Sequence, residues 1–378
     1  MKKLIFLFIL FICPLSVHAE ELIPNAVSGI LIEANSGKVI YEKDKDKQVS
    51  IASMTKMVAQ IIIMEELESK NIHLNDIVTV SRNASNMGGS QIYLEEGEKI
   101  TVEDLLKGIS VASGNDATVA MAEYISGSEK KFVEKMNKKV KELGLKNTHF
   151  SNSTGLDEKN HYSTAKDMAI IARELIVNHP KILEFSSIYE DYLRENTNRK
   201  FWLVNTNKLI RSYEGADGLK TGHTDNAGYC LAATAKRKNI RLIAIVLGEK
   251  DSKTRNKETT ELLDYGFINT KVKTLKNKGD IVKKKILNKS NTGYIDMVLE
   301  NDLNILEDKD KKENYKYEII TSKIKYPIKK NQVVGKIKVL SNSKVLTTEN
   351  LVSRFKIDKI ELKDYYFYNL KHFFYGHL

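Results

Sequence analysis

The sequence predicts an α+β domain followed by a small all-β domain. Strand-like segments come first, helix-like segments fill the middle, and strand-like segments return over residues 229–248. That order indicates a sheet assembled from both ends of the domain, with helices packed on it. Beyond about Phe267 the pattern changes to short alternating segments with few helix signals, which is typical of a β domain.

The strands predicted for the first domain come in two pairs. Residues 26–44 contain two segments of strand character on either side of the turn sequence Asn-Ser-Gly at 35–37. Residues 229–248 contain two more, around a turn near 238–239. Each pair is therefore expected to form a hairpin.

Helical periodicity predicts the elements in the middle of the chain. An almost uninterrupted apolar run predicts a helix from about Ser53 to Glu68. Residues 126–144 predict a second helix and residues 163–180 a third. In the third, Ser163 is the expected cap and Pro180 ends the helix.

The N-terminus has the features of a secretory signal peptide. Lys2 and Lys3 precede the apolar run 4–13, and Ala19 follows as a small residue at the cleavage position. The run is too short to span a bilayer well, so a signal peptide is predicted over residues 1–19. The alternative is an N-terminal anchor that is not cleaved.

Cysteine content, charge and histidine spacing limit the function classes. Once the signal peptide is removed, Cys230 is the only cysteine, so the secreted chain has no internal disulfide. The formal net charge of +11 favours anionic surroundings such as membrane headgroups or acidic wall polymers. A secreted chain seldom meets nucleic acid, so no such partner is expected. The histidines form no HExxH pattern, so neither a metal nor another cofactor is expected.

Ser53 and Lys56 form an SxxK pair at the start of the apolar helix. The same spacing recurs at Ser128/Lys131, Ser163/Lys166, Ser322/Lys325, Ser341/Lys344 and Ser353/Lys356. Most of those copies are expected to be surface pairs, whereas the apolar helix implies that Lys56 is buried. A buried lysine is costly unless it is paired or neutral. A neutral lysine beside a serine is a general base beside a nucleophile.

Two later segments supply what such a pair needs. Ser113 and Asn115 precede another apolar helix, where a hydroxyl can relay a proton and an amide can hold a substrate carbonyl. The chain's one KTG sequence begins at Lys220, and its glycine permits close approach of a ligand to the backbone. A second lysine near Lys56 would lower its pKa by like-charge repulsion and would attract an anionic substrate.

The segments SMTK, SGN and KTGHT, in that order, resemble the penicillin-recognising serine peptidases. Longer stretches around them are similar to the D-alanyl-D-alanine carboxypeptidases among the low-molecular-weight penicillin-binding proteins. The resemblance covers nearly the whole chain after the signal peptide. It implies a β-lactamase/transpeptidase-like domain, an antiparallel sheet with helices on both faces, followed by a small all-β domain. It also implies a cell-wall enzyme that removes the terminal D-alanine of peptidoglycan stem peptides and binds β-lactam antibiotics.

By the same resemblance, three residues carry the chemistry. Ser53 is the acylated nucleophile and Lys56 its base. Ser113 passes a proton toward the leaving amine. These three are the expected catalytic residues.

The resemblance also implies a set of binding residues. Asn115 holds the substrate or Lys56. Lys220 and Thr221 bind the terminal carboxylate, which Arg255 also contacts. The backbone N–H of His223, with that of the nucleophile, forms the oxyanion hole.

The predicted catalytic domain departs from the family pattern in one place and lacks a motif of its relatives. Thr154 stands where the carboxypeptidases often have a histidine, which leaves the route of the deacylating water open. The predicted catalytic domain contains no ExxLN pentapeptide of the class A β-lactamases, and the one ExxLN sequence of the chain, residues 300–304, lies in the predicted β domain. The alternatives are a β-lactamase or a D,D-endopeptidase on the same scaffold, or a wall-binding, penicillin-sensing module that is acylated but hardly turns over.

The C-terminal residues 355–378 are predicted to form an amphipathic helix at a membrane surface. One face carries Leu362, Tyr366, Phe367, Leu370, Phe373 and Phe374. The segment has too many polar residues to span a bilayer, and the alternative is docking on the protein's own β domain. The predicted organisation is a signal peptide at 1–19, a catalytic domain at 20–268, a β domain at 269–354 and the tail at 355–378. The predicted location is the outer face of the cell membrane or the cell wall.

Overall fold

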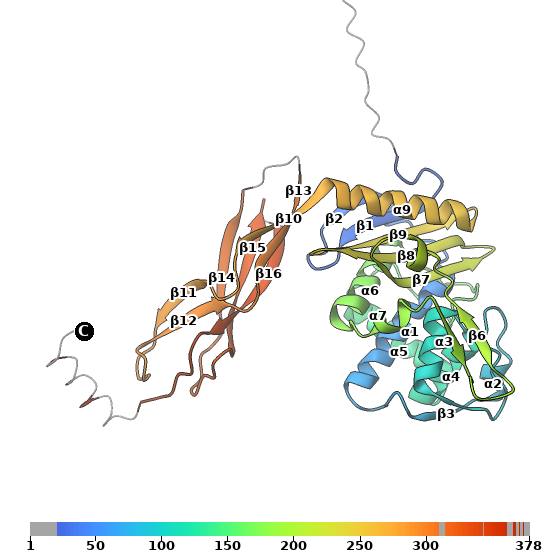
Figure 1. Ribbon diagram of the computed structural model, residues 1–378, viewed down its shortest axis with the longest axis horizontal. Helices are drawn as coiled ribbons and strands as arrows, with labels where there is room; N and C mark the ends of the chain where they lie inside the picture. The colour runs from blue at the N-terminus through green and yellow to red at the C-terminus, as the bar shows by residue number, and fades with distance from the viewer. Residues whose placement is uncertain are drawn as a thin grey trace, which may run out of the picture.

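The computed structural model describes residues 21–309, 314–342 and 344–360, together with residues 366, 367, 370 and 373. The predicted signal peptide and most of the predicted tail lie outside these residues. The described chain forms a helix-rich domain built on a five-stranded sheet, followed by an elongated β domain (Figure 1). None of the described helices is long and apolar enough to cross a membrane.

The sheet of the first domain is antiparallel, with strand order β2-β1-β9-β8-β7. Its strands are β1 (Ser28–Glu33), β2 (Val39–Lys43), β7 (Ala216–Thr224), β8 (Gly228–Arg237) and β9 (Ile240–Glu249). β1 pairs with β9 from Ser28↔Leu247 to Glu33↔Leu242. The first and last strands of the domain are therefore neighbours, which confirms a sheet assembled from both of its ends. The KTG sequence lies in β7, the edge strand.

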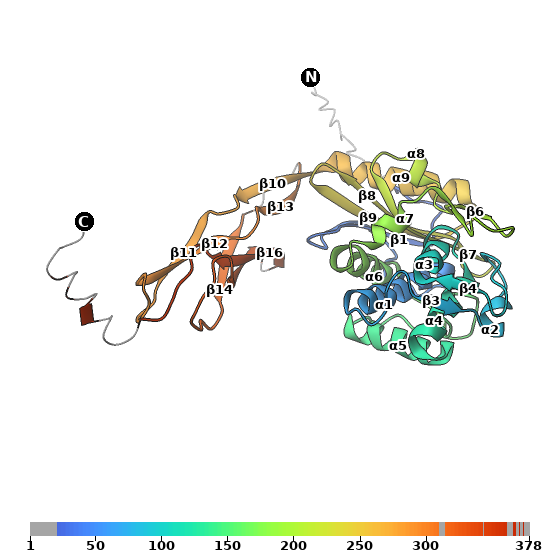
Figure 2. The same cartoon turned by 60° about the horizontal axis from the view of Figure 1, so that its bottom comes forward.

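Helices cover both faces of this sheet (Figure 2). Successive side chains of a strand point to opposite faces, so Leu31 and Leu242 join one core and Ile30 and Ile243 the other. The first core includes side chains from α8 (Leu209–Ser212) and α9 (Ser252–Asn269). The second, larger core includes side chains from α1 (Lys56–Glu68), α2 (Arg82–Ser85), α3 (Val102–Val111), α4 (Asn115–Ser126), α5 (Glu129–Glu142), α6 (Ala165–Asn178) and α7 (Ile182–Ser186). Two small hairpins pair β3 (Ile77–Thr79) with β4 (Lys99–Thr101) and β5 (Glu190–Leu193) with β6 (Phe201–Val204).

The first helix begins later than expected. Residues Ala52–Thr55 form a 3₁₀ turn, η1, and α1 starts at Lys56. Ala52 has a φ of +47°, a sparsely populated value for a residue with a side chain. From Met57 to Met64 every side chain of α1 is buried, because the helix passes through the centre of the larger core. This explains the uninterrupted apolar run.

The cap of the third predicted helix is corrected by one residue. The side chain of Thr164, not Ser163, accepts the hydrogen bond from the backbone N–H of Asp167 at the start of α6. Ser163 is taken up in a bridge with Val49, in which each backbone N–H donates to the other residue's carbonyl. The helix therefore starts one residue later.

The second domain is all-β, as expected. Its main sheet has the order β11-β12-β16-β15-β14, and β10 pairs with β13. The strands are β10 (Thr270–Lys276), β11 (Ile281–Ile286), β12 (Tyr294–Leu299), β13 (Leu303–Asp308), β14 (Lys316–Thr321), β15 (Val333–Ser341) and β16 (Lys344–Ser353). Ile357 is fully buried in the core of this domain and exchanges two backbone hydrogen bonds with Ile328. The first residues of the predicted tail thus pack on the β domain.

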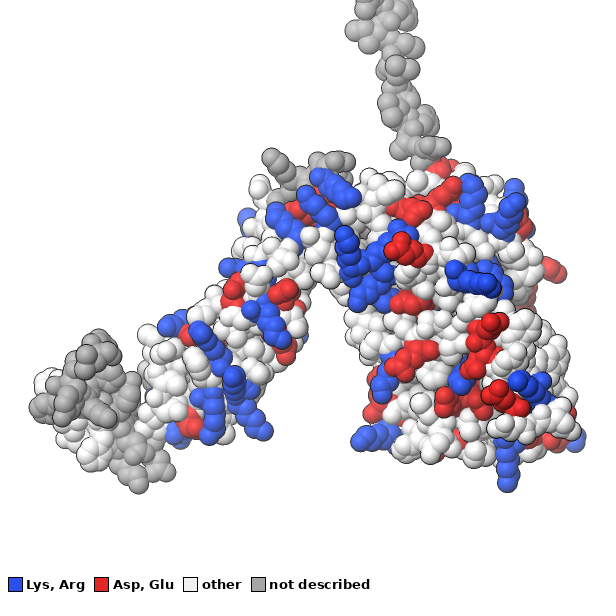
Figure 3. All heavy atoms as spheres, in the orientation of Figure 1, with Lys and Arg blue, Asp and Glu red and all other residues white. Residues whose placement is uncertain are grey.

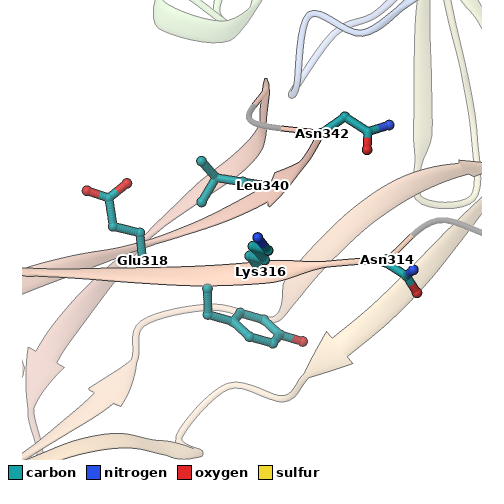
Figure 4. A pocket seen from close by; sticks show the side chains of 6 residues that line it. Asn314, Lys316, Glu318, Leu340 and Asn342 are labelled. Carbon is teal, nitrogen blue, oxygen red and sulfur yellow. The ribbon is translucent and has the colours of Figure 1, made fainter.

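A hollow lies beside β14 and the end of β15 (Figure 4). It has a volume of about 690 Å³ and is lined by Asn314, Lys316, Tyr317, Glu318, Leu340 and Asn342. The labelled side chains point apart rather than toward one centre. The hollow therefore brings no reactive groups together, and the predicted catalytic residues all lie in the first domain.

Candidate active site

Four segments of the first domain meet at the predicted site. Ser53 lies in η1 and Lys56 follows it at the start of α1, while Asn115 opens α4. The loop at Thr154 and the edge strand β7, with Lys220, complete the site. Ser53 is partly exposed.

Lys56 is fully buried and is held by three hydrogen bonds. Its Nζ lies 2.7 Å from Ser53 Oγ, 2.7 Å from Asn115 Oδ1 and 2.8 Å from the carbonyl oxygen of Thr154. None of these partners is a carboxylate. The amine is thus fixed beside the serine hydroxyl without a negative charge to keep it protonated.

The surroundings of Lys56 favour its neutral form. Burial lowers the pKa of the amine well below its usual value, and the positive charge of Lys220 lowers it further. Asp116 acts in the opposite direction and is the smaller influence. Its carboxylate is occupied by the backbone N–H groups of Ile92 and Leu94. A neutral amine has a lone pair that accepts the Ser53 proton.

Ser113 and Lys220 form a second serine–lysine pair. Lys220 Nζ donates to Ser113 Oγ at 2.8 Å and to the carbonyl of Thr221 at 2.9 Å. Burial, and then the charge of Arg255, lower the pKa of Lys220 to about 7. Ser113 has a φ of +63°, an unusual backbone conformation for a serine and one that is frequent at functional sites. Lys220 therefore changes its charge near neutral pH while in contact with this hydroxyl.

Asn115 connects the first pair to the loop between α2 and β4. Its Nδ2 donates to the carbonyl of Gly88 at 2.7 Å, and its backbone N–H donates to the carbonyl of Ser90 at 2.7 Å. Both ends of the side-chain amide are thus fixed, the oxygen on Lys56 and the nitrogen on the loop. This orients the amide without any substrate present.

Two glycines allow the backbone to pass close to the nucleophile. Gly155 has a φ of +88°, and a Cβ there would lie 2.0 Å from the carbonyl oxygen of Ala52. A Cβ on Gly222 of the KTG sequence would lie 2.7 Å from the carbonyl oxygen of Ile51 and 3.2 Å from the backbone nitrogen of Ser53. Side chains at either position would push η1 away, so β7 reaches the serine only because Gly222 is bare.

The residues expected to bind a carboxylate lie along β7 and α9. Thr221 is buried, and its Oγ1 lies 2.7 Å from Thr206 Oγ1. Arg255 is only 5% exposed and its guanidinium donates twice to Asn256 Oδ1. The positive charge of Arg255 lowers the pKa of Lys220. Among the described residues, the Arg255 side chain donates no hydrogen bond to the other predicted site residues. It can therefore act on a bound anion through charge.

His223 is exposed, and its ring stacks on Tyr229 with 4.0 Å between ring centroids. The ring is thus occupied by a surface contact. The role expected for this residue belongs to its backbone N–H.

The structure adds residues that sequence patterns do not single out. Thr206 contacts Thr221 across a long chain separation, and the carbonyl of Thr154 holds Lys56 whatever its side chain is. His161 is buried, and its ring lies 2.7 Å from Thr55 Oγ1. Burial lowers the pKa of His161 to about 4, so the ring adds no positive charge behind Lys56 at neutral pH. In the sequence, Thr206 is a threonine between two asparagines, and this pattern is too common to single it out.

The site combines three features: a serine beside a buried amine that has no counter-charge, a second serine–lysine pair, and an edge strand that passes close to the serine. Together these features are typical of a serine acyl-transfer enzyme. The profile of the family described as D-alanyl-D-alanine carboxypeptidase matches residues 16–251, and the chain belongs to that family. The profile described as penicillin-binding protein 5, C-terminal domain, matches residues 271–359.

Relatives of known activity extend the match along the chain. D-alanyl-D-alanine carboxypeptidase DacF of Bacillus subtilis (strain 168) is 47% identical over 89% of this chain and 87% of its own length. D-alanyl-D-alanine carboxypeptidase DacA of Escherichia coli (strain K12) is 36% identical over 89% of this chain and 87% of its own length. The protein is a D-alanyl-D-alanine carboxypeptidase of the serine peptidase type.

Two solved structures match most of this chain, and a third matches a shorter part of it. Penicillin-binding protein 5 of Haemophilus influenzae is 33% identical with a TM-score of 0.71, and the match covers 89% of this chain and 98% of that one. A peptidoglycan synthesis regulatory factor (PBP3) of Streptococcus pneumoniae reaches a TM-score of 0.78 at 29% identity, over 88% and 99% of the two chains. Penicillin-binding protein D2 of Listeria monocytogenes, solved in an ampicillin-bound form, matches 64% of this chain and 98% of its own at 31% identity and a TM-score of 0.58.

Proposed function

We propose that the carboxypeptidase reaction proceeds through an acyl-enzyme on Ser53. The observation that carries this is the fully buried Lys56 Nζ at 2.7 Å from Ser53 Oγ, with its pKa lowered and no carboxylate bound to it. In the first step Ser53 Oγ attacks the carbonyl between the two terminal D-alanines, and its proton moves to Lys56. The backbone N–H groups of Ser53 and His223 stabilise the resulting oxyanion.

The second serine–lysine pair completes the acylation. Ser113 passes a proton to the leaving nitrogen as the C–N bond breaks, so that D-alanine departs with a neutral amine. Lys56 then passes the proton that it took from Ser53 to the Ser113 hydroxyl, and its amine becomes neutral again. The hydrogen bond from Lys220 keeps the Ser113 hydroxyl oriented for this transfer.

Deacylation returns the enzyme to its starting state. A water molecule adds its oxygen to the acyl carbon as the bond from that carbon to Ser53 Oγ breaks; one of its protons passes through the base to Ser53 Oγ, and the other leaves with the product carboxyl group. Thr154 presents only its carbonyl to Lys56, and its hydroxyl is hydrogen-bonded to Asn152 Oδ1. Lys56 is thus the base nearest to the ester, and we assign it both half-reactions.

Recognition of the terminal carboxylate belongs to Lys220, Thr221 and Arg255. The three residues supply two cationic groups and one hydroxyl from β7 and α9, and the charge of Arg255 acts on Lys220. Asn115 holds Lys56, with which it is already hydrogen-bonded, and can also meet the substrate amide. β-Lactams present a comparable carboxylate and carbonyl and are proposed to acylate the same serine, as the ampicillin-bound relative suggests.

One assay separates this function from its alternatives. The mature protein is incubated with a D-Ala-D-Ala pentapeptide, a cross-linked muropeptide and a chromogenic β-lactam, and turnover of each is measured. Release of D-alanine from the pentapeptide as the fastest turnover supports the proposal. Faster opening of the β-lactam or of the cross-link would make it a β-lactamase or an endopeptidase. Stoichiometric acylation without turnover would make it a sensing module.

We further propose that residues 1–19 direct export and that residues 361–378 hold the enzyme at the outer face of the cell membrane. The support is sequence pattern alone, because these residues lie outside the described part or are only partly described. Residues 355–360 pack on the β domain, so the informative truncation ends at Ile360. In 1 M salt, where charge attraction is screened, the mature chain should sediment with membranes and the truncated chain should not. Penicillin labelling of both forms controls for folding.

A further inference from the structure

The positive charge of the protein is concentrated in one domain. Residues 21–269 contain 34 Lys or Arg against 35 Asp or Glu, whereas residues 270–360 contain 22 against 11. The first domain is therefore nearly neutral, and the excess equals the +11 of the whole chain. The proposed reaction takes place in the first domain and does not require this segregation.

Three loops form one end of the β domain, on the side away from the catalytic domain (Figure 1). They are residues 287–293 between β11 and β12, residues 322–332 between β14 and β15, and residues 354–360 after β16. We call them the distal loops. Backbone hydrogen bonds join the first to the third, from Asn291 N to the carbonyl of Asp358 at 3.1 Å, and the second to the third, from Ile328 N to the carbonyl of Ile357 at 2.8 Å. They form one continuous surface.

The distal loops carry eight basic residues and one acidic residue, Asp358. All eight are exposed: Lys289, Lys323, Lys325, Lys329, Lys330, Arg354, Lys356 and Lys359. Lys356 pairs with Asp358 at 2.9 Å and Arg354 lies 3.9 Å from Asp296, while the other six form no ion pair within the described residues. Figure 3 shows blue side chains gathered at this end of the domain with few red ones among them.

The opposite end of β12 has the reverse balance. The turns at 277–280 and 300–302 hold Lys278 against Asp280, Glu300 and Asp302. A basic composition spread evenly over the domain would not produce this contrast. The charge is therefore arranged along the domain, with its positive end at the distal loops.

Large apolar side chains lie beside these cations. Phe355 is 42% exposed, and the guanidinium of Arg354 lies 5.3 Å from its ring centroid. Ile286, the last residue of β11, is 78% exposed. Exposed aromatic and aliphatic side chains set among lysines are typical of surfaces that meet lipid headgroups, where the apolar part enters the boundary and the cations contact phosphate.

We infer that the distal loops are a contact surface for anionic lipid headgroups, additional to the tail. The inference rests on the proposed membrane association, because the chain leaves this surface at Ile360 and continues into the aromatic segment 361–378. That continuity favours a lipid surface over a soluble polyanion. The β domain then contacts the membrane through its distal loops, and the catalytic domain lies at the opposite end of the β domain.

The test compares two charge variants of the mature full-length chain that have the same net charge. The first replaces Lys323, Lys325, Lys329 and Lys330 by Gln, and the control replaces Lys70, Lys130, Lys131 and Lys141, exposed lysines of the catalytic domain, by Gln. Binding to phosphatidylglycerol and phosphatidylcholine vesicles is measured at low and high salt. A lysine near an anionic surface contributes about five-fold in affinity. The first variant should bind phosphatidylglycerol at least ten-fold more weakly, the control less than two-fold, and the difference should vanish in 1 M salt.

Further arms separate this inference from the proposal beneath it. The chain ending at Ile360 should keep weak, salt-sensitive binding to phosphatidylglycerol that the same four substitutions remove. Equal binding of the two variants would overturn the distal-loop surface while leaving the tail intact. If the unaltered chain binds no vesicle, the membrane association itself fails. If the four distal-loop substitutions abolish binding to poly(glycerol phosphate) but leave vesicle binding unchanged, the surface is a polymer site and the lipid assignment is overturned. Penicillin labelling of every form confirms the fold.

Discussion

The alkaline limb of the pH–rate profile should belong to Lys220, and Lys220→Arg should remove it. Lys220 is 1% exposed, and burial and Arg255 lower its pKa to about 7. In the proposed mechanism its charge attracts the substrate carboxylate, so binding is lost as pH rises through that value. An arginine stays charged at every accessible pH. The variant therefore keeps the cation where the lysine has lost it.

The magnitude follows from the pKa. The charged fraction of Lys220 falls about ten-fold for each pH unit above 7, so about 1% remains at pH 9. The kcat/KM of the unaltered enzyme for a D-Ala-D-Ala peptide should accordingly fall about 100-fold between pH 6 and pH 9, whereas that of Lys220→Arg should change by less than about three-fold. A bound carboxylate raises the pKa of Lys220, so kcat should decline at higher pH than kcat/KM.

The assay is D-alanine release from a pentapeptide across pH 5 to 10. Because arginine is larger and the site is buried, thermal melting of the variant is measured beside it. Arg255→Gln provides an independent check. Removing that neighbouring charge should shift the limb to higher pH even though it weakens binding. A limb that stays near pH 7 in folded Lys220→Arg would show that another group titrates and would refute the reasoning.

Three further predictions concern the remaining groups. Ser53→Ala should abolish covalent labelling by a fluorescent penicillin and leave the melting temperature nearly unchanged, since the side chain is partly exposed; labelling that survives would place the nucleophile elsewhere. Lys56→Arg should lose acylation altogether, because guanidinium cannot accept the serine proton; equal effects of arginine at positions 56 and 220, measured as acylation rates, would contradict their distinct roles. Thr206→Val should raise KM more than it lowers kcat, by freeing the hydroxyl of Thr221, and Thr206→Ser should restore most of it; steady-state kinetics that show no KM change in Thr206→Val would remove Thr206 from carboxylate binding.

The features that could be predicted from the sequence alone are those whose signal comes from residues close together in the chain or from the identities of reactive side chains. Alternating apolar residues around short turns specified β1, β2, β8 and β9, and helix periodicity specified α1, α5 and α6, because these signals depend on neighbours in the chain. The motifs at Ser53, Ser113 and Lys220 were visible because reactive side chains of unusual combination lie in order along the chain. The resemblance to the carboxypeptidases followed from them, and the family match, the relatives and the solved structures confirm the fold and the activity.

The tertiary structure decided what those residues do to one another. Lys56 was one of several lysines at SxxK spacing, and only its complete burial and the charge of Lys220 distinguish its amine from the surface copies. The contacts of Thr206 with Thr221 and of the Thr154 carbonyl with Lys56 join segments distant in sequence. The grouping of cations on the distal loops likewise depends on three segments meeting at one end of a sheet. The sequence by itself thus determined the identities and order of the reactive groups, whereas their pKa values, partners and surfaces arise from desolvation and long-range packing, which exist only once the chain is folded.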